Sequence, residues 1–350
     1  MKIMFVCWPF EDQGSSLVIK GYTEAAPSLG HEVLVYGRGD PKIPLHYSLD
    51  IQSADAVVFV FEWTTALWQG DHLDLVRLMS QVPRDRRIIL DGDGNYNDPI
   101  HVDGDYNHKS AEASRRWIDI CDSLCDKICQ PTLRPLRPNV IPFFFYAYNP
   151  SWEMPLDCSN KKYGMLYLGN SKFRWCGMYR VLRALEPIRQ QVGEIALVGH
   201  GWEAPPAWAA SMQMEEAYYT DQAYLKKMRV EVKHAIPFED VIDWMSKAIF
   251  NPVLSRPTFR HLQIVTPRFF ETPAANTIPL FLQDVSHVCG IYGEAAVELT
   301  LSEADGTDKL VDIMTRPAYY ATIVERMRQH LRREHSHAAR LDQLTKIVES

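Results

Sequence analysis

Two basic side chains stand in a segment that the sequence predicts to be a loop between a strand and a helix. Lys172 and Arg174 lie in "YLGNSKFRWCG" (167–177), just after Gly169 and Asn170 end a strand. Exposed backbone N–H groups at a helix start, together with two cations, form a site that can bind a diphosphate. Two solvated surface cations are the alternative interpretation.

A second charged pair lies in "VTPRFFETPAANTIPLFL" (265–282). Thr266 and the proline after it favour a helix start, which places Arg268 and Glu271 in the first turns on one face. The pair is either a surface ion pair or part of a ligand cradle. Because the strand that follows is too apolar to lie outside the core, Glu271 is predicted to face a crevice between two domains. There its carboxylate could accept hydrogen bonds from ribose hydroxyls.

Three further predicted strands end in residues that suit a ligand. Gly199 and His200 follow a strand in "LVGHGW", and the glycines there allow a ligand to approach the backbone closely. His234 and Pro237 open a turn in "HAIPFEDV" whose main chain could contact the edge of a nucleobase, although an ordinary turn explains it as well. Arg256 closes another strand and adds a cation.

Carboxylates follow two predicted strands of the first half. Asp12 lies in "WPFEDQGSS" (8–16), and Asp91 opens "DGDGNYNDPIHVDGDYNH" (91–108). Either carboxylate could take the proton of a hydroxyl group, and the alternatives are a helix-capping turn and a solvated loop. The second segment is no Ca²⁺ loop of the EF-hand type, because Tyr96 replaces the required glycine and Val102 the bidentate glutamate. No metal ligand is predicted.

The elements that must position these residues alternate between apolar strands and amphipathic helices. Strands are predicted at 2–8, 31–37, 55–63, 127–132, 139–149, 163–170, 194–202, 230–237, 248–254 and 277–282, and the segment 86–94 is predicted to be a strand that breaks into an acidic, glycine-rich loop. Helices are predicted between them, including 15–30, 66–82 and 177–192, and the region 308–350 is predicted to be helical. This alternation is typical of βαβ units, so the predicted fold is α/β, with two Rossmann-like αβα domains facing a central cleft. Ligands of such sheets bind beyond the carboxyl ends of the strands.

Composition excludes several classes of protein. The chain has 350 residues, with 46% hydrophobic and 23% charged residues, which indicates a folded protein of two domains. A net charge of −7 argues against a general nucleic-acid binder. Seven cysteines without paired spacing favour reduced thiols and a cytoplasmic location. No apolar run approaches the length of a membrane-spanning helix, and no signal peptide is recognised.

The segment "TPRFFETPAANTIPLFL" (266–282) resembles the donor-site signature of GT-B glycosyltransferases, most closely that of their CgeB-like branch within the group 1 glycosyl transferases. Arg268, Phe270 and Glu271 match its Arg-x-Phe-Glu element, and Ala275 and Asn276 stand in its small-residue turn, where the family usually has glycine. The charged helices of 308–344 are similar to the family's closing pattern. Gln263 replaces the second glutamate that retaining members often carry, so the stereochemistry stays open.

The resemblance implies an acceptor domain at 1–150, a nucleotide-sugar domain at 151–334 and a terminal helix at 335–350 that returns to the first domain. It implies sugar transfer from a nucleotide diphosphate to a hydroxyl acceptor, without a bound metal or any cofactor besides the donor. Glu271 would hold the ribose and Arg268 would lie near the phosphates, while Lys172 and Arg174 would stabilise the leaving group. Asp12 or Asp91 would be the base of an inverting enzyme. The alternatives are a sugar-nucleotide 2-epimerase and a non-catalytic sugar-nucleotide-binding protein.

Overall fold

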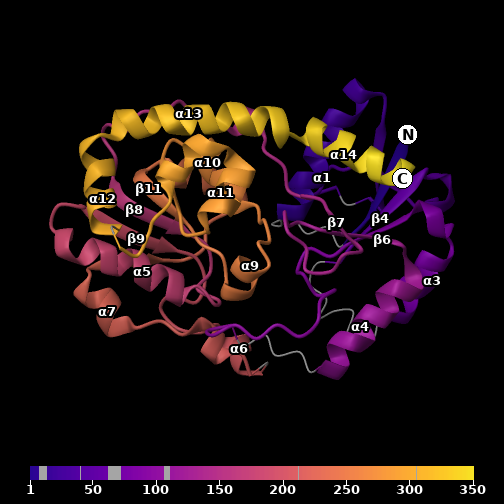
Figure 1. Cartoon of the computed structure of the whole chain (residues 1–350), viewed down its shortest axis with the longest axis horizontal. Coiled ribbons are helices and arrows are strands. Elements are labelled where there is room, and N and C mark those ends of the chain that lie inside the picture. Colours follow the sequence, from indigo (N-terminus) through magenta and orange to yellow (C-terminus); the bar gives the residue numbers. More distant parts are fainter. Residues whose placement is uncertain (8–13, 40, 62–71, 106–110, 212, 305) are drawn as a thin grey trace.

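The computed structural model describes residues 1–7, 14–39, 41–61, 72–105, 111–211, 213–304 and 306–350. Figure 1 shows two α/β halves side by side, each with a sheet between layers of helices. The chain ends lie close together on the first half (Figure 1). The predicted fold class, two Rossmann-like αβα units with a helix that returns to the first, is confirmed.

The first half contains a seven-stranded sheet among the described residues, with the order β3-β2-β1-β4-β5-β6-β7. Each neighbouring pair of strands is parallel. Apolar side chains alternate between its two faces because successive residues of a strand point in opposite directions. Phe5 thus joins the cluster under α1, while Met4 joins the cluster on the other face. The strands are β1 (Lys2–Val6), β2 (Glu32–Tyr36), β3 (Tyr47–Ser48), β4 (Ala56–Val60), β5 (Arg87–Leu90), β6 (Lys127–Gln130) and β7 (Val140–Pro142).

Across the described residues of the second half this architecture is repeated, with a five-stranded parallel sheet in the order β10-β9-β8-β11-β12. Every residue of β8 is buried, as expected for a central strand that is covered on both faces. The strands are β8 (Tyr163–Leu168), β9 (Glu194–Val198), β10 (Val230–Lys233), β11 (Ala248–Val253) and β12 (Ile278–Phe281). The two sheets end and begin on either side of residue 150, the boundary predicted between the domains.

Helices connect the strands and cover both faces of each sheet (Figure 1). The helix predicted at 66–82 is present as α3 from residue 72, and residues 62–71 lie outside the described part of the chain. The helices are α1 (Gly14–Ala25), α3 (His72–Ser80), α4 (Ala111–Leu124), α5 (Trp175–Leu185), α6 (Ala207–Ser211), α7 (Gln222–Lys227), α8 (Val241–Met245), α9 (Pro257–His261), α10 (Arg268–Ala274), α11 (Val285–Tyr292), α12 (Gly306–Thr315), α13 (Pro317–Glu334) and α14 (His337–Glu349).

The last two helices join the halves. Helix α13 runs along the second half, and α14 continues onto the first half beside α1 (Figure 1). Leu341, Leu344 and Ile347 of α14 belong to the same buried cluster as Ile3 and Phe5 of β1. The terminal helix is therefore part of the core of the first half.

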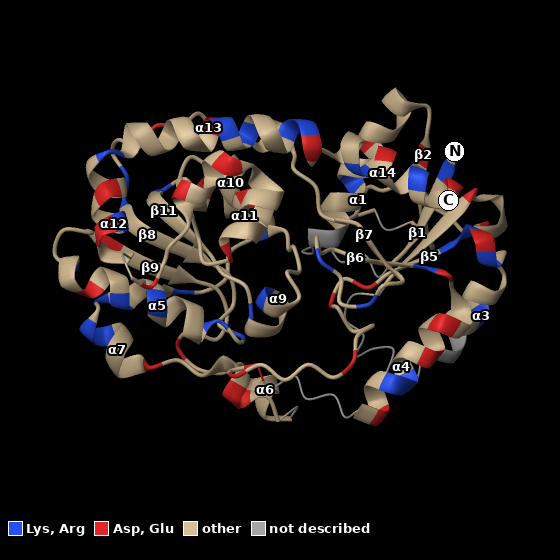
Figure 2. Ribbon diagram, viewed as in Figure 1, with Lys and Arg blue, Asp and Glu red and all other residues tan. Residues whose placement is uncertain are grey.

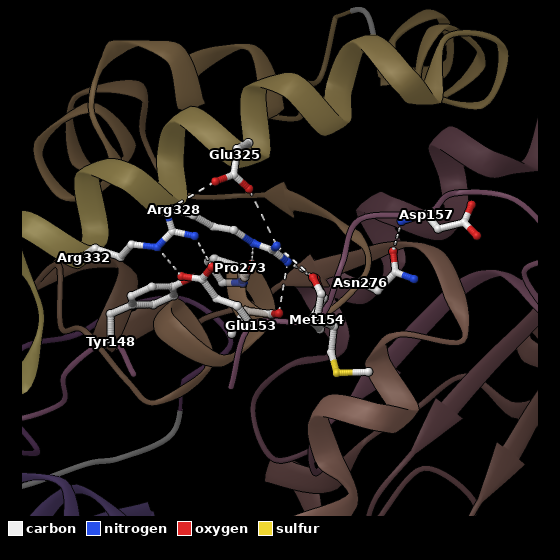
Figure 3. Close-up of polar contacts among 11 residues, drawn as sticks. Tyr148, Glu153, Met154, Asp157, Pro273, Asn276, Glu325, Arg328 and Arg332 are labelled. Carbon is white, nitrogen blue, oxygen red and sulfur yellow. Dashed lines mark hydrogen bonds and ion pairs between the residues drawn. The ribbon is translucent and has the colours of Figure 1, made fainter. Parts of the chain in front are cut away.

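Arg328 of α13 fixes the end of α10 (Figure 3). The residue is 2% exposed, and its guanidinium donates hydrogen bonds to the carbonyls of Pro273, Ala274 and Ala275 at 2.8, 3.0 and 2.9 Å. A further bond of 2.9 Å reaches the carbonyl of Met154 in the segment that connects the halves. A cation at a helix C-terminus satisfies carbonyls that have no partner within the helix. Arg328 thus ties α10, α13 and the connecting segment together.

Candidate active site between the two halves

The loops that follow β8 and β9 interlock at the carboxyl edge of the second sheet. Ser171 N donates to the carbonyl of His200 at 2.9 Å, and Trp202 Nε1 donates to that of Gly169 at 2.7 Å. Gly199 has φ 147°, and a Cβ there would lie 2.2 Å from the carbonyl oxygen of Gly169. Only glycine allows this approach. The predicted residues Gly169, Asn170, Gly199 and His200 are therefore brought together by the fold.

This edge is where the strand order reverses. Strands β9 and β10 lie on one side of β8, and β11 and β12 lie on the other. In open parallel sheets such a switch point leaves a crevice in which ligands bind. The loop after β10 is joined to this edge, because Gly199 N donates to the carbonyl of Lys233 at 3.0 Å. His234 and Pro237, both exposed, follow on that loop.

Three cations stand at the crevice, on the loops after β8 and β11. Arg174 Nη1 donates to Asn170 Oδ1 at 2.9 Å and to the carbonyl of Lys172 at 2.8 Å. Arg256 lies over the ring of Phe173, 5.3 Å from its centroid. Burial lowers the pKa of Lys172, and the nearby charge of Arg256 lowers it further. Figure 2 shows basic residues in the loops beside α9, on the side of the second half that faces the first.

Carboxylates of the first half face these cations. Asp105, whose side chain has no exposed surface, forms an ion pair with Arg256 at 3.1 Å and accepts a hydrogen bond of 2.9 Å from Thr258 N. Asp93 and Asp105 both raise the pKa of Lys172, against the effects of burial and Arg256. The acidic loop of the first half and the basic loops of the second therefore form one electrostatically coupled site.

Arg268 and Glu271 form the ion pair that their spacing predicts, and it lies at this same edge. Arg268 Nε also donates to the carbonyl of Leu168, the last residue of β8, at 2.9 Å. Glu271 is 3% exposed, and burial raises its pKa while Arg268 opposes that shift. Glu271 borders a cavity of about 10 Å³ together with Val18 of α1 and Phe238 of the loop after β10. The pair thus lies at the boundary between the halves, as predicted. Thr266 precedes it, and its carbonyl accepts a hydrogen bond from Phe269 N.

Three other residues of the predicted donor-site signature at 266–282 do not lie at the carboxyl edge of the second sheet. Phe270 is 1% exposed and packs in the core of the second half against His335. Ala275 is fully buried, and the Asn276 side chain accepts a hydrogen bond of 2.7 Å from Asp157 N in the segment between the halves (Figure 3). Helix α10 runs antiparallel to the strands, so it begins at their carboxyl edge and ends at the opposite edge. Ala275 and Asn276, which follow α10, are therefore remote from Arg268, and their prediction as donor contacts is corrected.

Of the two residues predicted to act as the base, the structure describes only Asp91. Asp91 has no exposed surface, and its carboxylate accepts hydrogen bonds from Asn95 N, Tyr96 N and Gln130 Nε2 at 2.9, 2.7 and 2.8 Å. These contacts fix the turn after β5, which favours a structural role for Asp91. Asp12 lies outside the described residues.

Asp93 and Asp105 are the residues that the sequence analysis did not single out. They occupy equivalent places in the near-repeat "DGDGN" and "DGDYN", two residues after Asp91 and Asp103. The repeat marks an acidic loop, but the sequence does not indicate which of its carboxylates turns toward the cations of the other half.

Within the described ranges, no group of three or more His, Cys, Asp or Glu side chains is arranged to hold a metal ion. Among the described helices, none is long and apolar enough to cross a membrane.

The sequence and the fold were compared with those of known proteins. Residues 180–346 match the family model described as "Glycosyl transferase-like". No curated protein matches the chain in sequence. An α-glucosyltransferase solved with UDP and a 13-mer DNA has a TM-score of 0.67 at 13% identity, over 100% of this chain and 99% of that one. The T4 phage β-glucosyltransferase solved with UDP-glucose has a TM-score of 0.61 at 12% identity, over 100% of both chains. The chain therefore has the GT-B glycosyltransferase fold, and its C-terminal half is similar to a glycosyl transferase-like family.

Proposed function

We propose that this protein transfers a sugar from a nucleotide-diphosphate sugar to a hydroxyl acceptor. The observation that carries the proposal is the arrangement at the switch point of the second sheet, where Lys172, Arg174 and Arg256 stand beside the interlocked glycine loops. A leaving diphosphate develops charge during transfer, and cations held in place beforehand stabilise that charge. These side chains would serve this purpose without a metal ion.

Donor recognition is proposed around Arg268 and Glu271. Arg268 is paired with Oε2 of Glu271, and within the described part of the chain the other oxygen, Oε1, has no hydrogen-bond partner. Glu271 can therefore keep its ion pair and still accept a hydrogen bond from a ribose hydroxyl. The exposed loop of His234 and Pro237 would contact the base. UDP-glucose is the first donor to test, because solved proteins of this fold contain it.

The acceptor would bind against the first half, and a hydroxyl acceptor needs a base if the reaction inverts. Asp12 and Asp91 stay predictions for that base. Asp93 is a third candidate, because its negative charge raises the pKa of Lys172 in the other half. Asp93→Asn is expected to lower kcat about 100-fold or more with little change in donor affinity. An unchanged kcat would exclude Asp93 as the base.

The acceptor class proposed is a small molecule, natural product or glycan. Similar solved proteins contain DNA, whereas this chain has a net charge of −7. Assays of the purified protein should therefore compare hydroxyl-bearing small acceptors with duplex DNA at low salt.

The experiment that tests the function is a nucleotide-sugar screen followed by product analysis. A true donor stabilises the folded protein by mass action, so one nucleotide sugar is expected to raise Tm in a saturable way. The same donor should then yield a glycosylated product in EDTA. An epimerised donor formed without acceptor would establish the epimerase instead. Donor binding without turnover on any acceptor would establish a binding protein.

A further inference from the structure

A cavity at the junction of the halves is bordered by none of the proposed donor residues. Its volume is about 530 Å³. It is bordered by Phe144 after β7, Gly290 of α11, His335 between α13 and α14, and Arg340 and Gln343 of α14. Drug-sized ligands occupy cavities of about 300–1,000 Å³. The volume therefore suits an organic molecule.

Arg340 brings to this cavity a positive charge that has no ion-pair partner among the described residues. Its guanidinium lies 5.7 Å from the ring centroid of Phe144, and one amino group donates to the carbonyl of Glu334. Nε is buried without a hydrogen-bond partner, and no carboxylate of the described residues forms an ion pair with Arg340. A buried charge without a counter-charge is costly. An anion in the cavity would remove this cost.

The two acidic residues that border the cavity form no ion pair with Arg340, although the charge of Glu334 raises the pKa of Arg340 against the larger effect of burial. Glu334 is paired with Arg333 at 2.5 Å, and Asp342 is paired with Lys346 at 2.7 Å. Both carboxylates are therefore engaged by exposed cations.

Two hydrogen-bond acceptors on the cavity wall also lack partners. Gln343 Nε2 donates to the carbonyl of Pro142 at 2.9 Å, while its Oε1 is buried and unpaired. His335 is 5% exposed, and its Nδ1 is unpaired. Burial keeps this ring neutral by lowering its pKa to about 3. A neutral imidazole has one nitrogen with a free lone pair, so Nδ1 can accept a hydrogen bond when the proton is on Nε2. Buried acceptors of this kind require donors such as hydroxyl groups.

We propose that this cavity is a second ligand site, which takes a phosphorylated sugar or polyol. The phosphate would bind Arg340 Nε, and ligand hydroxyls would donate to Gln343 Oε1 and His335 Nδ1. Inorganic phosphate would satisfy Arg340 alone and would leave most of the volume empty. The site is independent of the proposed donor site.

Because of the position of the cavity, a bound ligand would affect how the two halves move relative to each other. The two chain segments that join the halves run side by side here, because Tyr148 N donates to the carbonyl of His335 at 2.7 Å. Residues of the first half, of α11 and of α14 all border the same space. A ligand that contacts all of them fixes the position of one half relative to the other. Its occupancy would therefore change the rate at which the cleft opens and closes.

Calorimetry on the full chain tests the site, with glucose 6-phosphate as the probe and glucose and inorganic phosphate as matched controls. Saturable binding of glucose 6-phosphate is expected, at least tenfold tighter than that of either control. Arg340→Met should weaken it at least tenfold, while Arg326→Met, which removes an exposed arginine of α13, should leave it unchanged. Gln343→Leu provides a second variant should Arg340→Met not fold, and it too should weaken binding.

Several results would overturn the proposal. These are the absence of saturable binding, equal affinity for inorganic phosphate, or unchanged affinity in both Arg340→Met and Gln343→Leu. Competition between glucose 6-phosphate and UDP-glucose would place the probe in the donor cleft and would also overturn it. Simultaneous binding of the two ligands is the expected result.

Discussion

At the scale of single residues, charge is divided between the two sides of the cleft. The second half provides Lys172, Arg174 and Arg256, and the first half provides Asp93 and Asp105. A negatively charged donor would compete with these carboxylates for the cations. The Asp105–Arg256 pair is one contact between the halves, and a bound diphosphate would compete with Asp105 for Arg256.

Replacing Lys172 and Arg174 together with alanine removes two of the charges proposed to stabilise the leaving group. Removal of one such donor from an enzyme typically costs 10²–10³-fold in rate, so kcat is expected to fall about 100-fold or more. Steady-state kinetics with a donor identified by the screen provides the measurement. Lys226→Ala, an exposed lysine of α7, is the control. Full activity in the double variant would place the diphosphate elsewhere.

Glu271→Ala removes the carboxylate proposed to hold the ribose. Hydrogen bonds to charged groups contribute about 1.5–3 kcal/mol, so the Kd for donor is expected to rise about 10- to 150-fold. Titration calorimetry measures this, and Glu303→Ala, which alters an exposed carboxylate of the same half, should have no effect. Equal donor affinity in Glu271→Ala and the parent protein would remove Glu271 from the site.

At the scale of elements, α10 carries the proposed donor residues and depends on α13 for its position. Arg328 binds the carbonyls at the end of α10, and Arg332 forms an ion pair with Glu153 in the connecting segment (Figure 3). Tyr148 completes the network by donating to Glu153 at 2.9 Å. One end of α10 thus meets the proposed donor site, and its other end is attached through Arg328 to the segment that connects the halves.

Arg328→Met should destabilise the protein, because it leaves several buried carbonyls without partners. Each unsatisfied buried group costs about 1–3 kcal/mol, so the free energy of unfolding is expected to fall by about 3–5 kcal/mol. Chemical denaturation of the variant and of Arg326→Met provides the comparison, since Arg326 is exposed on the same helix. Equal stability of the two variants would contradict the assigned role of Arg328.

At the scale of the whole molecule, three buried histidines link folding to pH. Burial lowers the pKa of His287 and of His337 to about 4, and that of His335 to about 3. The unfolded chain takes up protons near pH 6.5, whereas the folded protein does not until the pH is much lower. The contribution of these histidines to the free energy of unfolding is therefore fully present above about pH 6.5 and is lost as the pH falls toward 4.

His337→Gln should reduce this pH dependence. Below about pH 6.5, each buried histidine lowers the free energy of unfolding by about 1.4 kcal/mol for each unit by which the pH falls. Between pH 7 and pH 5, the variant should therefore lose about 1–2 kcal/mol less stability than the parent protein. Denaturation at the two pH values provides the measurement, with the exposed His46→Gln as control. The same pH dependence in His337→Gln and His46→Gln would show that His337 does not contribute.

The sequence by itself determined the α/β class and the two repeated halves, because strand and helix periodicities and chain order are local properties. The return of the terminal helix to the first half was predicted from the family resemblance, since that packing joins segments more than 300 residues apart. It also predicted the residues of the cleft that directly follow strands, such as Gly169, Gly199 and Lys172, since all parallel strands end at one edge. Tertiary structure decided the rest. The direction of α10 carries Asn276 to the far edge, and the folding of the acidic loop buries Asp91 and turns Asp105 toward Arg256. Two of these outcomes depend on contacts between segments more than 100 residues apart, Asn276 with Asp157 and Asp105 with Arg256, and local pattern contains no information on such contacts.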